Sequence, residues 1–83
     1  MRAIFVMIKC EMGQAYQVAR AMVDGVEEAS EMHSISGQYD LMGKFYLAPD
    51  QDIGRFVVER LQTVPGVKDT YTLQTFNAFT ADG

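Results

Sequence analysis

Four consecutive residues, Gly37, Gln38, Tyr39 and Asp40, bring together the side chains best suited to surround a small polar molecule. They supply a flexible glycine, an amide, a phenol and a carboxylate in one short turn between two strand-like runs. A plain hairpin turn needs only two residues, usually Asn-Gly or Asp-Gly. In a binding turn, Asp40 accepts hydrogen bonds, backbone amides opened by Gly37 donate them, and Tyr39 forms a wall.

A purely structural explanation accounts for part of the same turn. Gly37 suits a backbone with positive φ, and Asp40 can accept hydrogen bonds from nearby backbone amides. Neither role requires Tyr39. Thr70 and Thr72 share one face of a later strand-like run and also have two explanations. Threonine is common in strands because it is β-branched, whereas its hydroxyl can also bind a polar ligand.

Six segments are expected to position these residues. Strands are predicted at 3–9, 26–36, 41–47 and 67–76, and helices at 13–23 and 50–64. The helices are predicted from apolar stripes with the spacing of one buried face: Ala15, Val18, Ala19 and Met22, then Ile53, Phe56, Val57, Leu61 and Val64. Gly25 is expected to cap the first helix in the left-handed conformation, and Asp50 to be the N-cap of the second. Gly43, inside a strand, indicates weak pairing or the close approach of another group.

The order strand, helix, strand, strand, helix, strand predicts an α+β fold of the ferredoxin-like βαββαβ type. Such a fold has a four-stranded antiparallel sheet with two helices on one face and leaves the other face bare. The first strand is apolar on both faces, with Ile4, Val6 and Ile8 on one and Ala3, Phe5 and Met7 on the other. A monomer would expose the second set, so we expect two sheets to pack back to back.

The length and composition of the whole chain limit the possible folds and functions. Its 83 residues predict a single domain spanning 1–83. Hydrophobic residues make up 48% of it, which is more than a small monomer easily hides. The single Cys10, expected to be a small buried hydrophobe, fits a reducing, cytoplasmic setting. No apolar run approaches the length of a membrane span.

Several function classes are disfavoured by composition. The net charge is −4 and the cationic side chains are scattered, whereas a phosphate backbone requires clustered cations, so direct nucleic-acid binding is not expected. His33 is the only histidine and has no second ligand at motif spacing, so we expect a solvated strand histidine and no metal site. We predict no catalytic residue and no cofactor, because no Ser-His-Asp set, phosphate loop or CxxC motif occurs.

An ordered set of short motifs covers nearly the whole chain. It comprises the Gly37-Gln38-Tyr39-Asp40 turn, then Asp50, Ile53 and Phe56, then Leu61 with Pro65-Gly66-Val67, and finally Thr70 and Thr72. In this order the set resembles the C-terminal effector-sensing domain of the Lrp/AsnC family of transcription regulators. The chain starts at the first strand of that domain, so it is similar to the stand-alone members that lack a helix-turn-helix DNA-binding domain.

The resemblance implies a function as well as a fold. It implies an amino-acid effector bound near the turn, with Gly37, Gln38, Tyr39 and Asp40 as contacts and Thr70 and Thr72 as further ones. It also implies a homodimer of facing sheets, a dimeric α/β barrel, that assembles into an octamer or a similar ring. Transcription would then be regulated through a full-length Lrp/AsnC-type regulator as partner.

Two other functions stay open at this stage. The first is a small dimeric α/β-barrel enzyme, similar in fold to the cofactor-free monooxygenases. Fold does not determine function, so the predicted topology leaves this alternative open. Such an enzyme requires a sizeable cavity between sheet and helices, and a cavity lined by His33 or Tyr46 would favour this function. The filled helix stripes instead indicate a packed core. The second alternative is an assembly module that binds no ligand.

Overall fold

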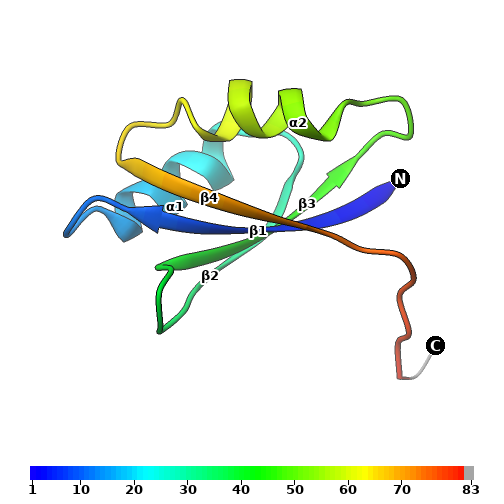
Figure 1. Cartoon of the computed structure of the whole chain (residues 1–83), viewed down its shortest axis with the longest axis horizontal. Helices are drawn as coiled ribbons and strands as arrows, with labels where there is room; N and C mark the ends of the chain where they lie inside the picture. Colours follow the sequence, from blue (N-terminus) through cyan, green and yellow to red (C-terminus); the bar gives the residue numbers. More distant parts are fainter. Residues whose placement is uncertain (82–83) are drawn as a thin grey trace.

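The computed structural model describes residues 1–81, which form four strands and two helical segments (Figure 1). The elements are β1 (Arg2–Cys10), α1 (Ala15–Gly25), β2 (Ala29–Ser34), β3 (Leu41–Leu47), α2 (Ile53–Phe56), its π-helical continuation η1 (Val57–Leu61) and β4 (Val67–Gln74). The strands form one antiparallel sheet in the order β2-β3-β1-β4. This arrangement confirms the predicted ferredoxin-like α+β fold.

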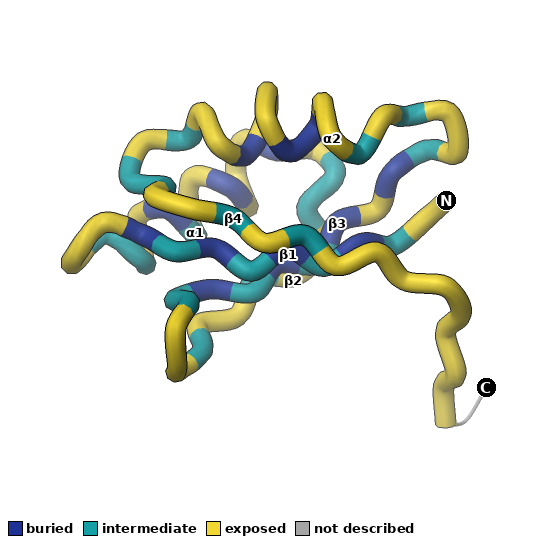
Figure 2. Tube along the Cα trace, in the orientation of Figure 1, coloured by how far each residue is buried: buried dark blue, intermediate teal, exposed yellow. Residues whose placement is uncertain are grey.

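The core lies between one face of the sheet and the helices. Ile4, Val6 and Ile8 of β1 point into it, together with Val18 and Met22 of α1. The remaining fully buried side chains of the core come from β3 and η1: Leu41, Phe45, Leu47 and Leu61. The predicted helix stripes are therefore the faces that pack against the sheet, and Figure 2 shows this buried layer along β1, β3 and the helices.

Gly43 lets a large ring lie directly over the strand. A Cβ atom at Gly43 would lie 2.7 Å from Cε2 of Phe45 and 3.0 Å from the methyl carbon of Met32. The Phe45 ring, which is fully buried, in turn makes an edge contact with Phe56, with ring centroids 5.5 Å apart. The close approach expected at this strand glycine is confirmed.

Among residues 1–81, no helix covers the other face of the sheet. Directly opposed residues of antiparallel strands share a face, and the register pairs Met7 with both Met42 and Tyr71, and Phe5 with Leu73. These residues, together with Tyr46, form what we call the open face: Phe5, Met7, Met42, Tyr46, Tyr71 and Leu73. Tyr71 is 54% exposed and Leu73 is 39% exposed. The second apolar set of β1, to which Phe5 and Met7 belong, therefore lies within a larger uncovered apolar surface.

A bulge changes the faces of β4. Lys9 pairs with Asp69 whereas Cys10 pairs with Val67, so Lys68 is an additional residue with no opposite partner on β1. Val67 consequently packs against the core, although simple alternation from Tyr71 and Leu73 would place it on the open face.

Several predicted boundaries move by two or three residues. The expected left-handed cap at Gly25 is wrong, because Gly25 has no positive φ and the chain leaves α1 through an extended Val26. The N-cap of α2 is Asp52 rather than Asp50, and its side chain accepts a hydrogen bond from the amide of Arg55. The turn before it is closed by Gln51, whose side chain accepts a hydrogen bond from the Ala48 amide, so the helix begins later.

Within residues 1–81, none of the helices combines the length and the apolar character needed to span a bilayer.

Candidate ligand site at the turn between β2 and β3

The turn that joins β2 to β3 is bound to the end of β1 through Asp40. The Asp40 amide donates to the carbonyl of Ile8 at 2.9 Å, and its carboxylate Oδ2 accepts a hydrogen bond from the Cys10 amide at 2.8 Å. The amide of Ile35 donates to the Asp40 carbonyl at 2.9 Å and closes the turn. Gly37 has a φ of 114°, as expected for its turn role.

Asp40 therefore has a structural role that leaves part of its carboxylate available. Oδ2 satisfies the backbone amide of Cys10, whereas Oδ1 accepts no hydrogen bond from any residue in 1–81. The side chain is half-buried and lines a hollow, so a ligand with a hydrogen-bond donor can reach it.

Tyr39 extends from the turn toward the open face. Its ring stacks on that of Tyr71, with centroids 6.2 Å apart and an interplanar angle of 25°. Tyr39 is half-buried and lines a second hollow. It therefore borders this hollow and joins the turn to the open face.

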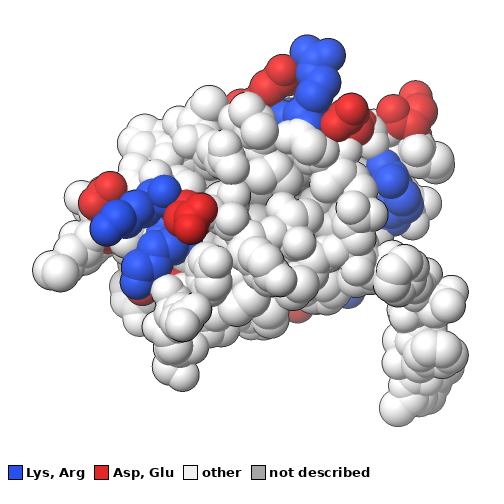
Figure 3. Space-filling view, viewed as in Figure 1, with Lys and Arg blue, Asp and Glu red and all other residues white. Residues whose placement is uncertain are grey.

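Two adjoining hollows surround the turn and share two lysines. The first, of about 430 Å³, is lined by Lys9, Cys10, Glu11, Met12, Gly13, Ala15, Asp40 and Lys68. The second, of about 410 Å³, is lined by Lys9, Gln38, Tyr39, Lys68 and Asp69. Neither lysine forms an ion pair with any of residues 1–81. Figure 3 shows cationic and anionic atoms side by side where β1 ends and β4 begins.

This arrangement can hold a zwitterion. The two ammonium groups suit a carboxylate, and the Asp40 carboxylate suits an ammonium group. Lys68 is the bulge residue of β4, and bulges commonly redirect a side chain beside a functional site. Sequence reasoning missed Lys9 and Lys68 because they looked like scattered cations. The signal that could have found them is the β1–β4 register, which brings them to one end of the sheet.

Comparison with known proteins identifies the family. The family model described as the Lrp/AsnC ligand-binding domain matches residues 3–82. The chain belongs to the Lrp/AsnC ligand-binding domain family. It is 36% identical over 62 residues to an uncharacterized HTH-type transcriptional regulator of Pyrococcus horikoshii, an alignment that covers 75% of this chain. It spans only 38% of the length of that relative.

Solved structures show the same fold in other proteins. The crystal structure of FFRP-DM1 has a TM-score of 0.83 and 22% identity, and the match covers 92% of this chain and all of the other. A transcriptional regulator of Neisseria meningitidis, solved in complex with L-methionine, has a TM-score of 0.81 and 16% identity, and the match covers 95% of this chain and 52% of the other.

Two residues implied by the resemblance lie away from the turn in this Lrp/AsnC-type domain. Thr70 and Thr72 pair with Ile8 and Val6, so both are on the helix-facing side of the sheet. The hydroxyl of Thr70 accepts a hydrogen bond from Gln62 at 2.8 Å. Tyr39 lies against the opposite face. Within one protomer, the structure thus groups Gly37, Gln38, Tyr39 and Asp40 but does not bring the two threonines to them.

Cys10 lies beside Asp40 but is poorly suited to chemistry. It is 6% exposed and belongs to the core, as predicted. Burial, followed by the nearby Asp40 carboxylate, raises the pKa of its thiol. Because the thiolate is the nucleophilic form, this environment disfavours nucleophilic chemistry at Cys10.

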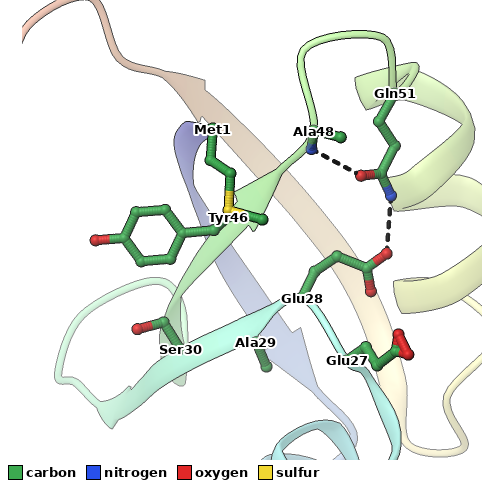
Figure 4. A pocket seen from close by; sticks show the side chains of 8 residues that line it. All are labelled: Met1, Glu27, Glu28, Ala29, Ser30, Tyr46, Ala48 and Gln51. Atoms are coloured by element: carbon green, nitrogen blue, oxygen red, sulfur yellow. Dashed lines mark hydrogen bonds between the residues drawn. The ribbon is translucent and has the colours of Figure 1, made fainter.

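A separate hollow of about 460 Å³ lies near Tyr46 at the other end of the sheet. Glu28 accepts a hydrogen bond from the Gln51 side chain at 2.8 Å, and a nitrogen of Arg60 lies 3.7 Å from its other oxygen. Figure 4 shows Gln51 between Ala48 and Glu28, with Tyr46 pointing away from Glu28. These contacts link the segment before β2 to the turn before α2 and to η1, and Oε1 of Glu28 is buried without a hydrogen-bond partner among residues 1–81.

The two residues considered for an enzymatic cavity lie outside the core. His33 is exposed, and its Nε2 lies 3.0 Å from Oε1 of Glu31. That hydrogen bond is the main cause of the lowered pKa of the Glu31 carboxyl. Tyr46 lies on the open face with Lys44 at 5.1 Å from its ring centroid. Neither residue lines a space between sheet and helices.

Proposed function

We propose that this domain binds a free amino acid at the turn between β2 and β3 and acts as an effector-binding and oligomerisation module in transcriptional regulation. The observation that carries the proposal is the pair of hollows at the turn: Lys9 and Lys68 line both of them, and Asp40 lines the first. Membership of the Lrp/AsnC ligand-binding domain family supports it. The complex of the Neisseria regulator with L-methionine supports the choice of an amino acid.

Each residue of the proposed site has a role that follows from its chemistry. Asp40 Oδ1 accepts a hydrogen bond from the ammonium group of the effector, and Lys9 and Lys68 bind its carboxylate. The lysines join the turn amides as donors to this carboxylate, although the amide of Asp40 itself is already bonded to Ile8. Tyr39 covers one side of the effector, and Gln38 lines the hollow beside it.

The proposal includes an assembly. Two copies pack through their open faces as a dimeric α/β barrel, and dimers then form an octamer or a similar ring with the turn at their contacts. Gly37 remains a proposed contact within the turn, and Thr70 and Thr72 remain proposed contacts of second rank. The two threonines would have to reach the effector from a neighbouring protomer, because they lie on the helix side of their own sheet.

The regulatory effect follows from linkage. An effector that binds one assembly more tightly shifts the population toward it by its differential affinity alone. With a net charge of −4, these 83 residues are a poor DNA-binding surface. We therefore assign the DNA contact to a full-length Lrp/AsnC-type regulator that joins the assembly in the cytoplasm.

An enzymatic function is not proposed. The space between sheet and helices is filled by fully buried side chains, including Phe45, Met22 and Leu61. The effector-binding function is preferred over a ligand-free assembly module because the matching family model is that of a ligand-binding domain.

Isothermal titration calorimetry against the twenty amino acids tests the proposal. We expect heat from at least one of them, and a change in sedimentation at the same concentration. The matching amine without a carboxylate and the matching hydroxy acid without an ammonium group should each bind at least about tenfold more weakly, the worth of one lost charged contact. No heat from any amino acid would refute the proposal.

A further inference from the structure

The last residues that the structure describes carry two phenylalanines with almost no contacts. Strand β4 ends at Gln74, earlier than the predicted Phe76, and residues 75–81 continue as an irregular tail. Phe76 is 93% exposed and Phe79 is 91% exposed. Figures 1 and 2 show the tail leaving the sheet on the side away from α2. Residues 75–81 contain no charged side chain.

The root of this tail is held in place. The Thr75 hydroxyl donates a hydrogen bond to the carbonyl of Ala3 on β1. This contact directs the chain past the open face of the sheet. The tail therefore starts from a defined position and direction, although its two rings are uncovered.

A hollow of about 480 Å³ separates the tail from its own sheet. Phe5, Lys44 and Tyr46 form its floor, and Phe76 and Phe79 lie on the tail side. The Lys44 ammonium group lies over both aromatic rings of the floor, 5.9 Å from the centroid of Phe5 and 5.1 Å from that of Tyr46. The tail thus borders the open face without covering it.

We infer that, in the back-to-back dimer, the tail of each copy lies across the open face of the other copy. This inference rests on the dimer that is part of the proposed function. A second copy of this chain is the occupant that fits, because its open face is apolar and would enter the space that the tail borders. Two-fold symmetry then makes the exchange reciprocal, so each copy gives one tail and receives one.

The area of the four rings supports this choice. A buried phenylalanine removes roughly 150–250 Å² from water, so four rings in a dimer contribute about 600–1,000 Å². A stable interface buries about 1,200–2,000 Å² in total. The tails would therefore supply about half of a standard interface and join the open faces into one continuous apolar surface.

Sedimentation equilibrium of a double variant, Phe76→Ser with Phe79→Ser, tests the inference. Burying one phenylalanine is worth about tenfold or more in an equilibrium constant, and the variant removes four rings from the dimer, so we expect the dimer dissociation constant to rise at least about 10,000-fold. The matched control is Tyr16→Ser, which removes a 78% exposed aromatic residue on α1 and should leave that constant unchanged. Circular dichroism of all three proteins should coincide, since neither ring contributes to the core.

The outcomes separate the inference from the proposed function. If the double variant dimerises as tightly as the wild type, the inference is wrong. The proposed effector site is not affected by that result, because calorimetric titration with amino acids tests it separately. The inference is also wrong if only assemblies larger than the dimer are lost, because the tails would then act between dimers. A wild type that stays monomeric at high concentration would overturn both this inference and the proposed dimer.

A photo-crosslink locates the tail directly. Benzoylphenylalanine is placed at position 79, and isotopically labelled chains are mixed with unlabelled ones before illumination. We expect crosslinked peptides of mixed label that join position 79 to β1 or β3 of the other copy. Crosslinks confined to single chains would show that the tail covers its own sheet and would refute the exchange.

Discussion

Asp40→Ala should weaken both the fold and the effector site, because one carboxylate serves both. Its Oδ2 accepts a hydrogen bond from the Cys10 amide at 2.8 Å. A hydrogen bond to a charged group contributes about 1.5–3 kcal/mol, and its loss leaves that amide without its acceptor. For a domain of this size, about 2 kcal/mol corresponds to a fall of roughly 8–16 °C in Tm.

Asp40→Asn separates the two roles. The asparagine side-chain oxygen can still accept from the Cys10 amide, so we expect a loss of no more than about 1 kcal/mol in the free energy of unfolding. The remaining NH₂ group is a donor and would face the ammonium group of the effector. Affinity for the effector should therefore fall at least about tenfold, or 1.4 kcal/mol, while the fold is nearly unchanged.

Thermal and urea unfolding of the three proteins, with calorimetric titration of the effector, measure both effects. A wild-type dissociation constant in Asp40→Asn would refute the placement of the ammonium group at Asp40. An unchanged Tm in Asp40→Ala would refute the structural role of the bond to Cys10. Lys9→Gln combined with Lys68→Gln is the complementary variant, which should weaken carboxylate binding without touching the turn.

Three further substitutions and one chemical reaction test local features of the fold. Gly43→Ala should lower the free energy of unfolding in urea by about 1–3 kcal/mol, since its Cβ would lie 2.7 Å from the Phe45 ring. Gly25→Ala is the matched control: the space around Gly25 is open, so this substitution should raise the free energy of unfolding by about 0.5–1 kcal/mol. Asp52→Ala removes the N-cap of α2 and should cost about 1 kcal/mol by the same measurement; no change would contradict the cap. Cys10 should react with iodoacetamide at least about tenfold more slowly in the folded protein than in denaturant, because burial protects the thiol and raises its pKa. Equal rates would contradict its place in the core.

The fold could be predicted because local patterns and tertiary packing agree. β3 has the predicted bounds, Leu41–Leu47, since its alternation and its flanking turns are both clear. The stripes of both helices could be read from spacing alone, because each helix buries a single face. The helix ends could not be read in the same way. Asp50 and Asp52 are both possible N-caps of α2. Asp52 takes this position because the Gln51 side chain accepts a hydrogen bond from the Ala48 amide and closes the preceding turn.

The candidate site could be predicted only in part, because it depends on register. The turn residues are consecutive and were found together. Lys9 and Lys68 are 59 positions apart (68 − 9) and meet through the β1–β4 ladder, whose bulge no local pattern indicates. The bulge also places Val67 in the core. A one-residue change of register moves a side chain to the other face of a sheet, so such details require the pairing itself.

Tyr39 gives the proposed effector site a physical connection to the proposed dimer. It borders the hollow at the turn, and its ring stacks on Tyr71, which belongs to the open face. A ligand that fixes the Tyr39 ring thereby restricts Tyr71, whose 54% exposed surface is what a second sheet would cover. Effector binding and sheet pairing then act on the same pair of rings, so each should change the affinity of the other by an equal factor. Tyr71→Ala should remove this coupling while it leaves Lys9, Lys68 and Asp40 in place.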